Sequence, residues 1–258
     1  MVKKYYEFVP KSEYSEYLHL SEKLVRLLVK NLNAKCINSK YYIIGSAGKR
    51  NLVTRLVIGE ERQPIDVDIN LEIDLFSLYK NYRRLDFLKE FIRNELNRII
   101  KESNKSFSDG QNSSSVLTYI LSNDKDQIAF SFDIAIVSRN KNNELQRLKF
   151  AKKSNSYTWT VVFGSSNLEE KVRLIKTKED WNKLRTTYLK LKNKYIGDEN
   201  HPSYVCYKMA VEEIYNQICK EEDLDYNAEE QKKFYCPFCG AEKEYEDEIC
   251  SVCNDDDD

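Results

Sequence analysis

The chain has 258 residues, of which 41% are hydrophobic and 32% are charged, with only seven Gly and four Pro. This composition excludes a disordered or collagen-like chain and is typical of a helix-rich globular protein with one large domain or two smaller ones. The formal net charge of −1 combines a basic stretch, Arg139 to Lys194, with an acidic end that begins at Glu221. This favours a surface that handles polyanions, with solvated helix faces as the alternative.

Apolar periodicity predicts regular structure along most of the chain. In chain order, the sequence predicts a helix at 12–33 capped by Ser12, strands at 41–44 and 65–73, a helix at 82–103, strands at 116–121, 127–137 and 158–163, and helices at 167–194 and 203–220. Residues 51–59 fit either a strand or a helix. This order indicates an α+β fold, in which a mixed sheet with flanking helices precedes an α-helical lobe.

The stretch from Ile65 to Ile73 alternates between apolar and polar residues, which places Asp66 and Asp68 on one face of the predicted strand. Residues two apart in a strand are separated by about 7 Å, and like charges that close repel each other. A water-facing edge or a bound divalent cation would compensate the two charges. Glu72 and Asp74 follow, and we expect both to be solvated.

A third acidic residue, Asp133, lies on the face of the predicted strand 127–137 that also carries Ser131 and Ala135. Charged side chains are seldom buried unless they are paired or bound to a metal. Three aspartates on neighbouring strands could converge on one site. Such oxygen-only ligands suit Mg²⁺ or Mn²⁺ rather than zinc.

Three motifs together resemble the DNA polymerase β-type nucleotidyltransferase superfamily: "IIGSAGK" (43–49), "IDVDI" (65–69) and "FDIAIV" (132–137). The segment "HPSYVCYKMAVEEI", which begins at His201, resembles the helix that closes the active site in the cyclic-dinucleotide-synthase and oligoadenylate-synthetase-like (CD-NTase) branch. The resemblance covers about residues 12 to 220. It implies a palm domain that transfers a nucleoside monophosphate from a triphosphate to a hydroxyl group.

The resemblance also assigns roles to residues of this chain. Gly45 and Ser46 would hold the β- and γ-phosphates through backbone N–H groups. Asp66, Asp68 and Asp133 would ligate two Mg²⁺ ions, and Asp133 would also accept the proton of the acceptor hydroxyl. Further nucleotide contacts are assigned to Lys49, Ser203 and Lys208, although surface and helix-capping roles are the alternative.

The sequence departs from the family pattern at two places. The gap between Gly45-Ser46 and Asp66 is longer than usual because "VTRLVIGEERQ" is inserted, and we expect these extra residues to form a hairpin at the rim of the site. Gln63-Pro64 also replaces the Thr- or Ser-rich run that commonly precedes the first aspartate.

Four of the seven cysteines form the pattern C-x2-C-x10-C-x2-C near the C-terminal end. Two such turns supply the four thiolates of a closed, structural zinc site, here Cys236, Cys239, Cys250 and Cys253. The surrounding acidic residues argue against contact with a phosphate backbone. The three other cysteines, Cys36, Cys206 and Cys219, are expected to be ordinary buried thiols.

These observations predict a catalytic palm at 1–164, a helical lobe at 165–222, and a zinc ribbon with an acidic tail at 230–258. We expect a cytoplasmic protein without a membrane partner, since no apolar run approaches a bilayer span and residues 1–10 lack a signal core. The resemblance implies an NTP substrate and a nucleotide acceptor, giving a second messenger in antiphage defence. Transfer to tRNA or other RNA 3′ ends, or to a protein, stays open, as do a polyanionic or protein activator and a non-enzymatic, degenerate binding module.

Overall fold

The computed structural model describes residues 2–48, 51–81, 84–103, 105–108, 110–122, 128–162, 167–221, 234–235 and 242–243. The chain divides into two compact units. We call them the sheet unit, which comprises Val9–Arg55 and Arg62–Val162, and the helical unit, which comprises Met1–Phe8, Leu56–Glu61 and Phe163–Asp258.

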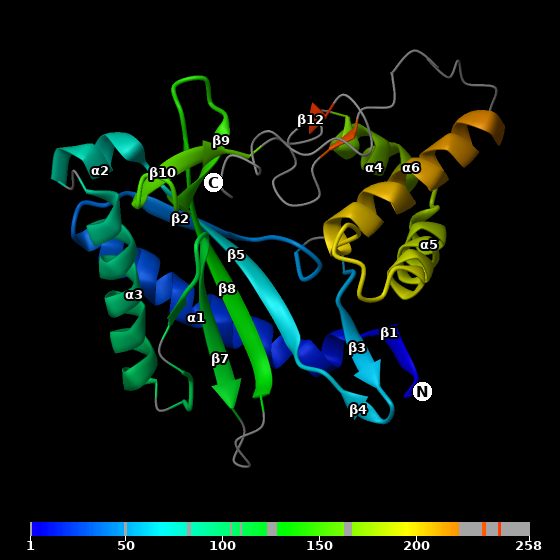
Figure 1. Cartoon of the computed structure of the whole chain (residues 1–258), viewed down its shortest axis with the longest axis horizontal. Coiled ribbons are helices and arrows are strands. Elements are labelled where there is room, and N and C mark those ends of the chain that lie inside the picture. Colours follow the sequence, from blue (N-terminus) through cyan, green and yellow to red (C-terminus); the bar gives the residue numbers. More distant parts are fainter. Residues whose placement is uncertain are drawn as a thin grey trace. The chain divides into compact units, whose positions relative to one another are not determined.

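The described residues of the sheet unit form helices α1, α2 and α3 and most of the strands (Figure 1). Its helices are α1 (Lys11–Ala34), α2 (Leu75–Asn81) and α3 (Leu85–Glu102). Its strands are β2 (Ser39–Ile43), β5 (Ile65–Ile73), β6 (Gln111–Asn112), β7 (Val116–Ser122), β8 (Ile128–Arg139), β9 (Leu145–Ala151) and β10 (Ser156–Val161).

These strands form one mixed sheet in the order β10-β9-β8-β5-β2, and β7 pairs with both β6 and β8. The central strands β5 and β8 run parallel, whereas β2 pairs antiparallel with β5, and β7 and β9 pair antiparallel with β8. The mixed sheet with flanking helices confirms the α+β prediction.

Helices α1 and α3 cover one face of this sheet, and the core lies between the two layers (Figure 1). In α1, Leu24, Leu28 and Leu32 recur every four residues and form one buried stripe. The odd-numbered residues of β5 and the even-numbered residues of β8 face the helices, for example Ile69 and Phe132, and both are fully buried. The opposite face therefore receives the polar residues of both strands.

The helical unit contains α4 (Leu168–Thr177), α5 (Trp181–Lys194) and α6 (Ser203–Glu221), and α6 packs against the other two helices. Strand β1 (Lys4–Phe8) joins them through Tyr6, whose backbone N–H donates to Asn193 Oδ1 at 2.7 Å. The short strands β11 (Phe234–Tyr235) and β12 (Glu242–Lys243) pair antiparallel.

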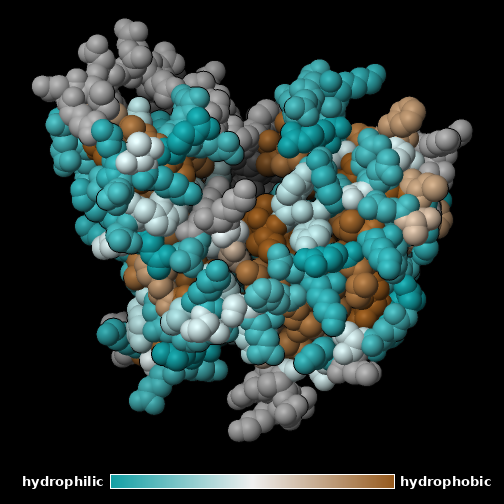
Figure 2. Space-filling model, turned by 180° about the vertical axis from the view of Figure 1, so that it is seen from behind, coloured by the Kyte–Doolittle hydropathy of each residue, from teal (hydrophilic) through white to brown (hydrophobic). Residues whose placement is uncertain are grey.

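On the face drawn in Figure 2, hydrophilic residues predominate and apolar residues show between them. Within the described ranges, no helix combines the length and the apolar character that a bilayer-spanning segment needs.

The ambiguous segment 51–59 forms a strand, β3 (Thr54–Ile58), and the inserted residues form the expected hairpin. Gly59, at φ +66°, makes its turn, and β3 lies between β1 and β4 (Glu61–Arg62) in a three-stranded sheet. The helix predicted at 167–194 is in fact two helices, because Glu179 adopts a φ of +59° between α4 and α5.

Some local predictions were wrong. Helix α1 is preceded by Pro10 and has no side-chain cap, so Ser12 lies inside its first turn. Cys36 is exposed, whereas Cys206 and Cys219 are buried. Glu72 is also buried, and Asp74 accepts hydrogen bonds from the backbone N–H groups of residues 76 and 77 at the start of α2. The expectation of a solvated acid was therefore wrong for Glu72, which pairs with Lys40 and Arg139, whereas Asp74 is exposed as expected.

Candidate active site

The three predicted aspartates lie on the face of the sheet opposite α1 and α3. Across the parallel pair β5–β8, Asp68 is the direct partner of Asp133, and Asp66 is the partner of Ser131 one row earlier. Side chains on the same face of adjacent strands at one register position are neighbours. The fold thus brings together carboxylates from positions 65 residues apart in the chain.

Hydroxyl groups on β7 and β8 donate hydrogen bonds to two of these carboxylates. Thr118, the antiparallel partner of Asp133 on β7, donates from Oγ1 to Asp133 Oδ1 at 2.6 Å. Ser131 donates from Oγ to Asp66 Oδ1. Each carboxylate keeps a second oxygen for another partner.

The Gly45-Ser46 turn lies directly against this group. Strand β2 ends at Ile43, and the backbone N–H of residue 44 donates to the Asp68 carbonyl at 2.9 Å. Gly45 has a φ of +65°, and a Cβ built on it would lie 2.5 Å from Asp68 Oδ2. A side chain at position 45 would therefore collide with the carboxylate, so both the backbone conformation and the close approach require glycine.

Burial and mutual repulsion disfavour ionisation of the three acids. Burial, followed by repulsion from Asp133 and Asp68, raises the pKa of Asp66 to about 6. Asp66 is exposed, so solvent screens part of this effect. Burial and repulsion from Asp133 also raise the pKa of Asp68, and burial raises the pKa of Asp133 despite the Thr118 hydrogen bond.

Arg147 on β9 is the cation that partly offsets this charge. It is half-buried, and its attraction lowers the pKa values of both Asp68 and Asp133. Sequence reasoning missed Arg147, because β9 was not predicted. Thr118 was also missed, although its place in a predicted strand was a usable signal, and Ser131 was recognised only as a face neighbour of Asp133.

The donor set fits a hard divalent cation, because every side chain in it offers oxygen. In the described part of the chain, however, no three or more His, Cys, Asp or Glu side chains are already arranged to hold a metal ion. Residues Asp66 and Asp133 each use one oxygen to accept a hydroxyl hydrogen bond in this conformation. Metal binding would therefore draw on their second oxygens and on Asp68.

The remaining predicted residues lie in the helical unit or outside the described residues. Ser203 begins α6 in the helical unit, where Lys208 also lies with its Nζ 5.4 Å from the centre of the Tyr204 ring. Burial lowers the pKa of Lys208. Lys49 and the four cysteines predicted to bind zinc, Cys236, Cys239, Cys250 and Cys253, lie outside the described residues.

Comparison with solved structures gives the fold a context. No protein-family model matches the sequence, and neither does any curated protein. The structure resembles the STING-associated CdnE c-di-GMP synthase of Capnocytophaga granulosa with a TM-score of 0.51 and 15% identity, over 85% of this chain and 64% of that one.

Two further solved structures resemble it with TM-scores below 0.5. CdnC of E. coli MS115-1, solved with ATP, scores 0.46 at 12% identity over 94% of this chain and 72% of that one. The Vibrio cholerae DncV cyclic AMP-GMP synthase, in complex with a linear intermediate, has a TM-score of 0.42 at 10% identity over 80% of this chain and 55% of that one.

The likeness to the first of these synthases establishes the fold. This chain spans 64% of the length of that CdnE protein, and their identity is 15%. The activity is therefore argued below from the site itself.

Proposed function

We propose that the chain is a metal-dependent nucleotidyltransferase that transfers a nucleoside monophosphate from an NTP to a hydroxyl group and releases pyrophosphate. One observation carries the proposal: the Gly45 turn lies against the carboxylate of Asp68, which in turn is paired across the sheet with Asp133. A glycine turn beside clustered carboxylates suits a triphosphate and the cations that accompany it.

In this proposal each residue has a distinct role. Backbone N–H groups at Gly45 and Ser46 bind the β- and γ-phosphates, and Asp66 and Asp68 hold Mg²⁺ or Mn²⁺ together with Asp133. Bound divalent ions would neutralise the carboxylates, lower the pKa of the attacking hydroxyl and stabilise the leaving pyrophosphate.

The chain's own residues handle the proton. The acceptor oxygen forms a bond to the α-phosphorus, the bond between that phosphorus and the pyrophosphate oxygen breaks, and the hydroxyl proton passes to the carboxylate of Asp133. The hydrogen bond from Thr118 to Oδ1 of Asp133 holds this carboxylate in position for the transfer.

For the acceptor we propose a second nucleotide, giving a nucleotide second messenger of the kind used in antiphage defence in the cytoplasm. The support is the fold shared with a c-di-GMP synthase. Lys49, Ser203 and Lys208 are proposed as additional nucleotide contacts. The alternatives, transfer to RNA or protein and a non-catalytic binding module, are outcomes of the experiment below.

We also propose a structural zinc site at Cys236, Cys239, Cys250 and Cys253. Strands β11 and β12 pair with Tyr235 opposite Glu242, on either side of the segment that carries the first cysteine pair. A C-x2-C pair between two short antiparallel strands is typical of zinc ribbons. Four thiolates would leave no open ligand position, so the zinc would stabilise the fold of this segment.

Incubation with labelled ATP, GTP, CTP and UTP and either Mg²⁺ or Mn²⁺, followed by chromatography, tests the activity. We expect pyrophosphate and a nucleotide product, both lost in Asp68→Asn and Asp133→Asn. Asp86→Asn is the matched control, because Asp86 is a carboxylate in the first turn of α3 that pairs with Arg84. Label that enters added tRNA would instead identify RNA as the acceptor, and the absence of any transfer would favour the binding module.

A further inference from the structure

Three buried polar atoms on the face of the sheet opposite α1 and α3 have no hydrogen-bond partner in the described part of the chain. They are Asn70 Oδ1, Glu72 Oε2 and Arg147 Nε. Asn70 and Glu72 are each only 8% exposed. Buried polar groups are almost always satisfied, and an unsatisfied one costs roughly 1–3 kcal/mol. The three atoms therefore call for a partner that the described chain does not supply.

The strand register places these side chains on one continuous surface, which we call the polar strip. Asn70 is the partner of Ala135, one row beyond the pair Asp68–Asp133. In the next row, Val137 lies between Glu72 on β5 and Arg147 on β9. Ala135 and Val137, which are 3% and 0% exposed, lie between the polar groups on either side.

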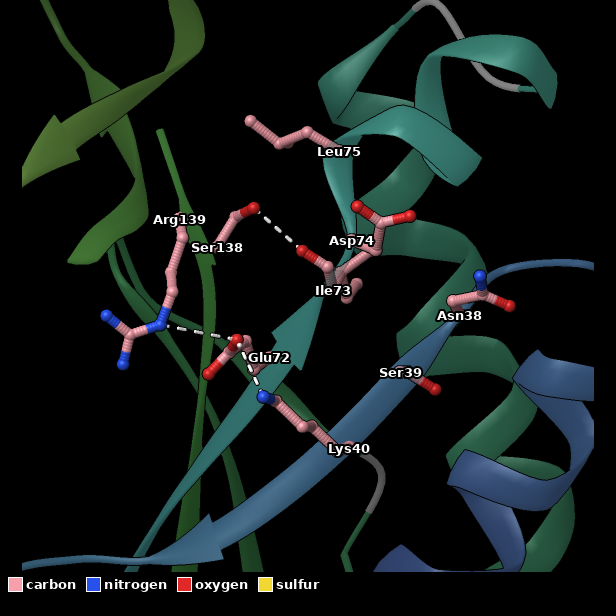
Figure 3. Close-up of a pocket in the computed structure, with 9 residues that line it drawn as sticks. All are labelled: Asn38, Ser39, Lys40, Glu72, Ile73, Asp74, Leu75, Ser138 and Arg139. Carbon is pink, nitrogen blue, oxygen red and sulfur yellow. Dashed lines mark hydrogen bonds and ion pairs between the residues drawn. The ribbon is translucent and has the colours of Figure 1, made fainter. Parts of the chain in front are cut away.

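Glu72 is held at the outer end of the polar strip by two cations (Figure 3). Its Oε1 lies 3.2 Å from Lys40 Nζ and 3.6 Å from Arg139 Nε, which leaves Oε2 unpaired. A cavity of about 340 Å³ opens at the carboxyl ends of β5 and β8, and of the three residues with unsatisfied atoms Glu72 lines it. Ligands commonly bind beyond the carboxyl ends of parallel strands, and this volume suits one small ligand.

The polar strip and the Gly45 turn lie on opposite sides of the aspartates. Strand β2 runs antiparallel to β5, with Ile43 opposite Ile69, so the turn after it lies toward Asp66. The strip extends in the other direction, toward Glu72. If the turn binds the triphosphate, the strip is placed to receive the acceptor, whose hydroxyl must reach Asp133. Four residues of strand, about 13 Å, separate Asp133 from Val137 in the row of Glu72 and Arg147. The acceptor must therefore span this distance between its hydroxyl and its base.

The donors and acceptors of the strip can be compared with those of the four nucleotide bases. Asn70 Oδ1 and Glu72 Oε2 are acceptors, whereas Arg147 Nε is a donor. Guanine presents two adjacent N–H positions, N1 and N2, beside the carbonyl O6, and arginine is the commonest partner of its acceptor edge. Adenine and cytosine offer one amino group beside ring acceptors, and uracil offers one N–H between two carbonyls.

We propose that the polar strip is the base-reading part of the acceptor subsite and that it selects a guanine nucleotide. The acceptor role of the strip rests on the proposed function, but its preference for guanine can be measured by binding alone, without catalysis. Asn70 and Glu72 accept from the N–H groups, Arg147 donates to the carbonyl or ring-nitrogen edge, and Lys40 and Arg139 hold Glu72 in place.

Calorimetric titration of the full chain with GMP, IMP, AMP, CMP and UMP tests the base preference directly. We expect GMP to bind roughly ten- to hundredfold more tightly than AMP, CMP or UMP. IMP, which lacks the 2-amino group, should fall between them. In Glu72→Gln, which keeps the size of the side chain but places an amide where an acceptor is needed, the preference for GMP should largely vanish. Glu144→Gln, an exposed residue outside the strip, is the control.

The same variants in the transfer assay separate the two proposals. Selective GMP binding that is lost in Glu72→Gln, without transfer from any NTP, would support the guanine site and refute the proposed activity. Transfer that uses all acceptor bases equally would overturn the guanine proposal and leave the activity standing. Equal binding of all monophosphates by the wild-type chain would also overturn it, whether or not Glu72→Gln folds.

Discussion

Replacing Gly45 by alanine tests whether the turn and the carboxylate act as one unit. A Cβ at this position would lie 2.5 Å from Asp68 Oδ2, whereas ordinary van der Waals contact begins near 3.4 Å. The carboxylate or the turn must therefore move by about 0.9 Å. A misplacement of about 1 Å at a reacting centre lowers the rate roughly a hundredfold. We expect at least this loss of transfer activity in Gly45→Ala.

The substitution also strains the backbone, because Gly45 has a φ of +65°. A non-glycine residue in the left-handed region costs about 1–2 kcal/mol, which lowers the melting temperature by roughly 2–8 °C for a chain of this size. A loss of activity caused only by partial unfolding would follow this change in stability. The control must therefore carry the same strain without the collision.

Gly197 supplies that control. It has a φ of +79°, and a Cβ built on it meets nothing within 4 Å. Gly197→Ala should lose stability much as Gly45→Ala does while keeping near-normal activity. Activity would be measured as pyrophosphate release at saturating NTP, and stability by thermal unfolding monitored by circular dichroism. If both variants had equal activity, the contact between the turn and Asp68 would have no catalytic importance, and the reasoning would be refuted.

Three further predictions concern single groups. Thr118→Val removes the hydroxyl that donates to Asp133 at 2.6 Å, so the pKa of Asp133 should rise further and the acidic limb of the rate–pH profile should move to higher pH; an unmoved profile would contradict this role. In the metal-free protein the pKa of Asp66 is raised from 3.8 to about 6, so the folded state binds the proton more tightly and its stability falls as the pH rises across that interval. Asp66→Asn should remove this loss. Urea unfolding at neutral pH should give the variant a free energy of unfolding about 1 kcal/mol higher than that of the wild type, a value kept small because the exposure of Asp66 weakens the pKa effect. A variant less stable than the wild type at neutral pH would refute this prediction. Elemental analysis should find one zinc ion per chain, which Cys250→Ser loses and Cys36→Ser retains; zinc retained in the first variant would exclude the proposed site.

The sequence contained enough information to locate the two central strands and their faces. Strict alternation from Ile65 to Ile73 predicts a strand with those bounds, and the structure has it there. The same pattern predicts which side of β8 faces α1 and α3, because Phe130, Phe132 and Ile134 are apolar and their neighbours are small or polar. These features depend only on local periodicity, which a single sequence displays.

Features that depend on strand pairing were not accessible in this way. The partnership of Asp68 with Asp133 follows from the parallel register of β5 and β8, which no local pattern encodes. Glu72 appeared to be a solvated acid because nothing near it in sequence signals Arg139, which reaches it from the adjacent strand. Arg147 was missed for a similar reason, since the chain around it is basic and its strand was not recognised.

The distribution of unsatisfied groups itself argues for function on the face of the sheet opposite α1 and α3. Asn70, Glu72 and Arg147 each keep a buried atom without a partner there, and the neighbouring carboxylates repel one another. On the opposite face, the described residues show one comparable group, Trp159 Nε1, within an otherwise apolar core. A domain is stable by only about 5–15 kcal/mol, and each unsatisfied group costs about 1–3 kcal/mol. Apolar side chains at these positions would give a more stable sheet, so the polar ones are best explained by a ligand that satisfies them.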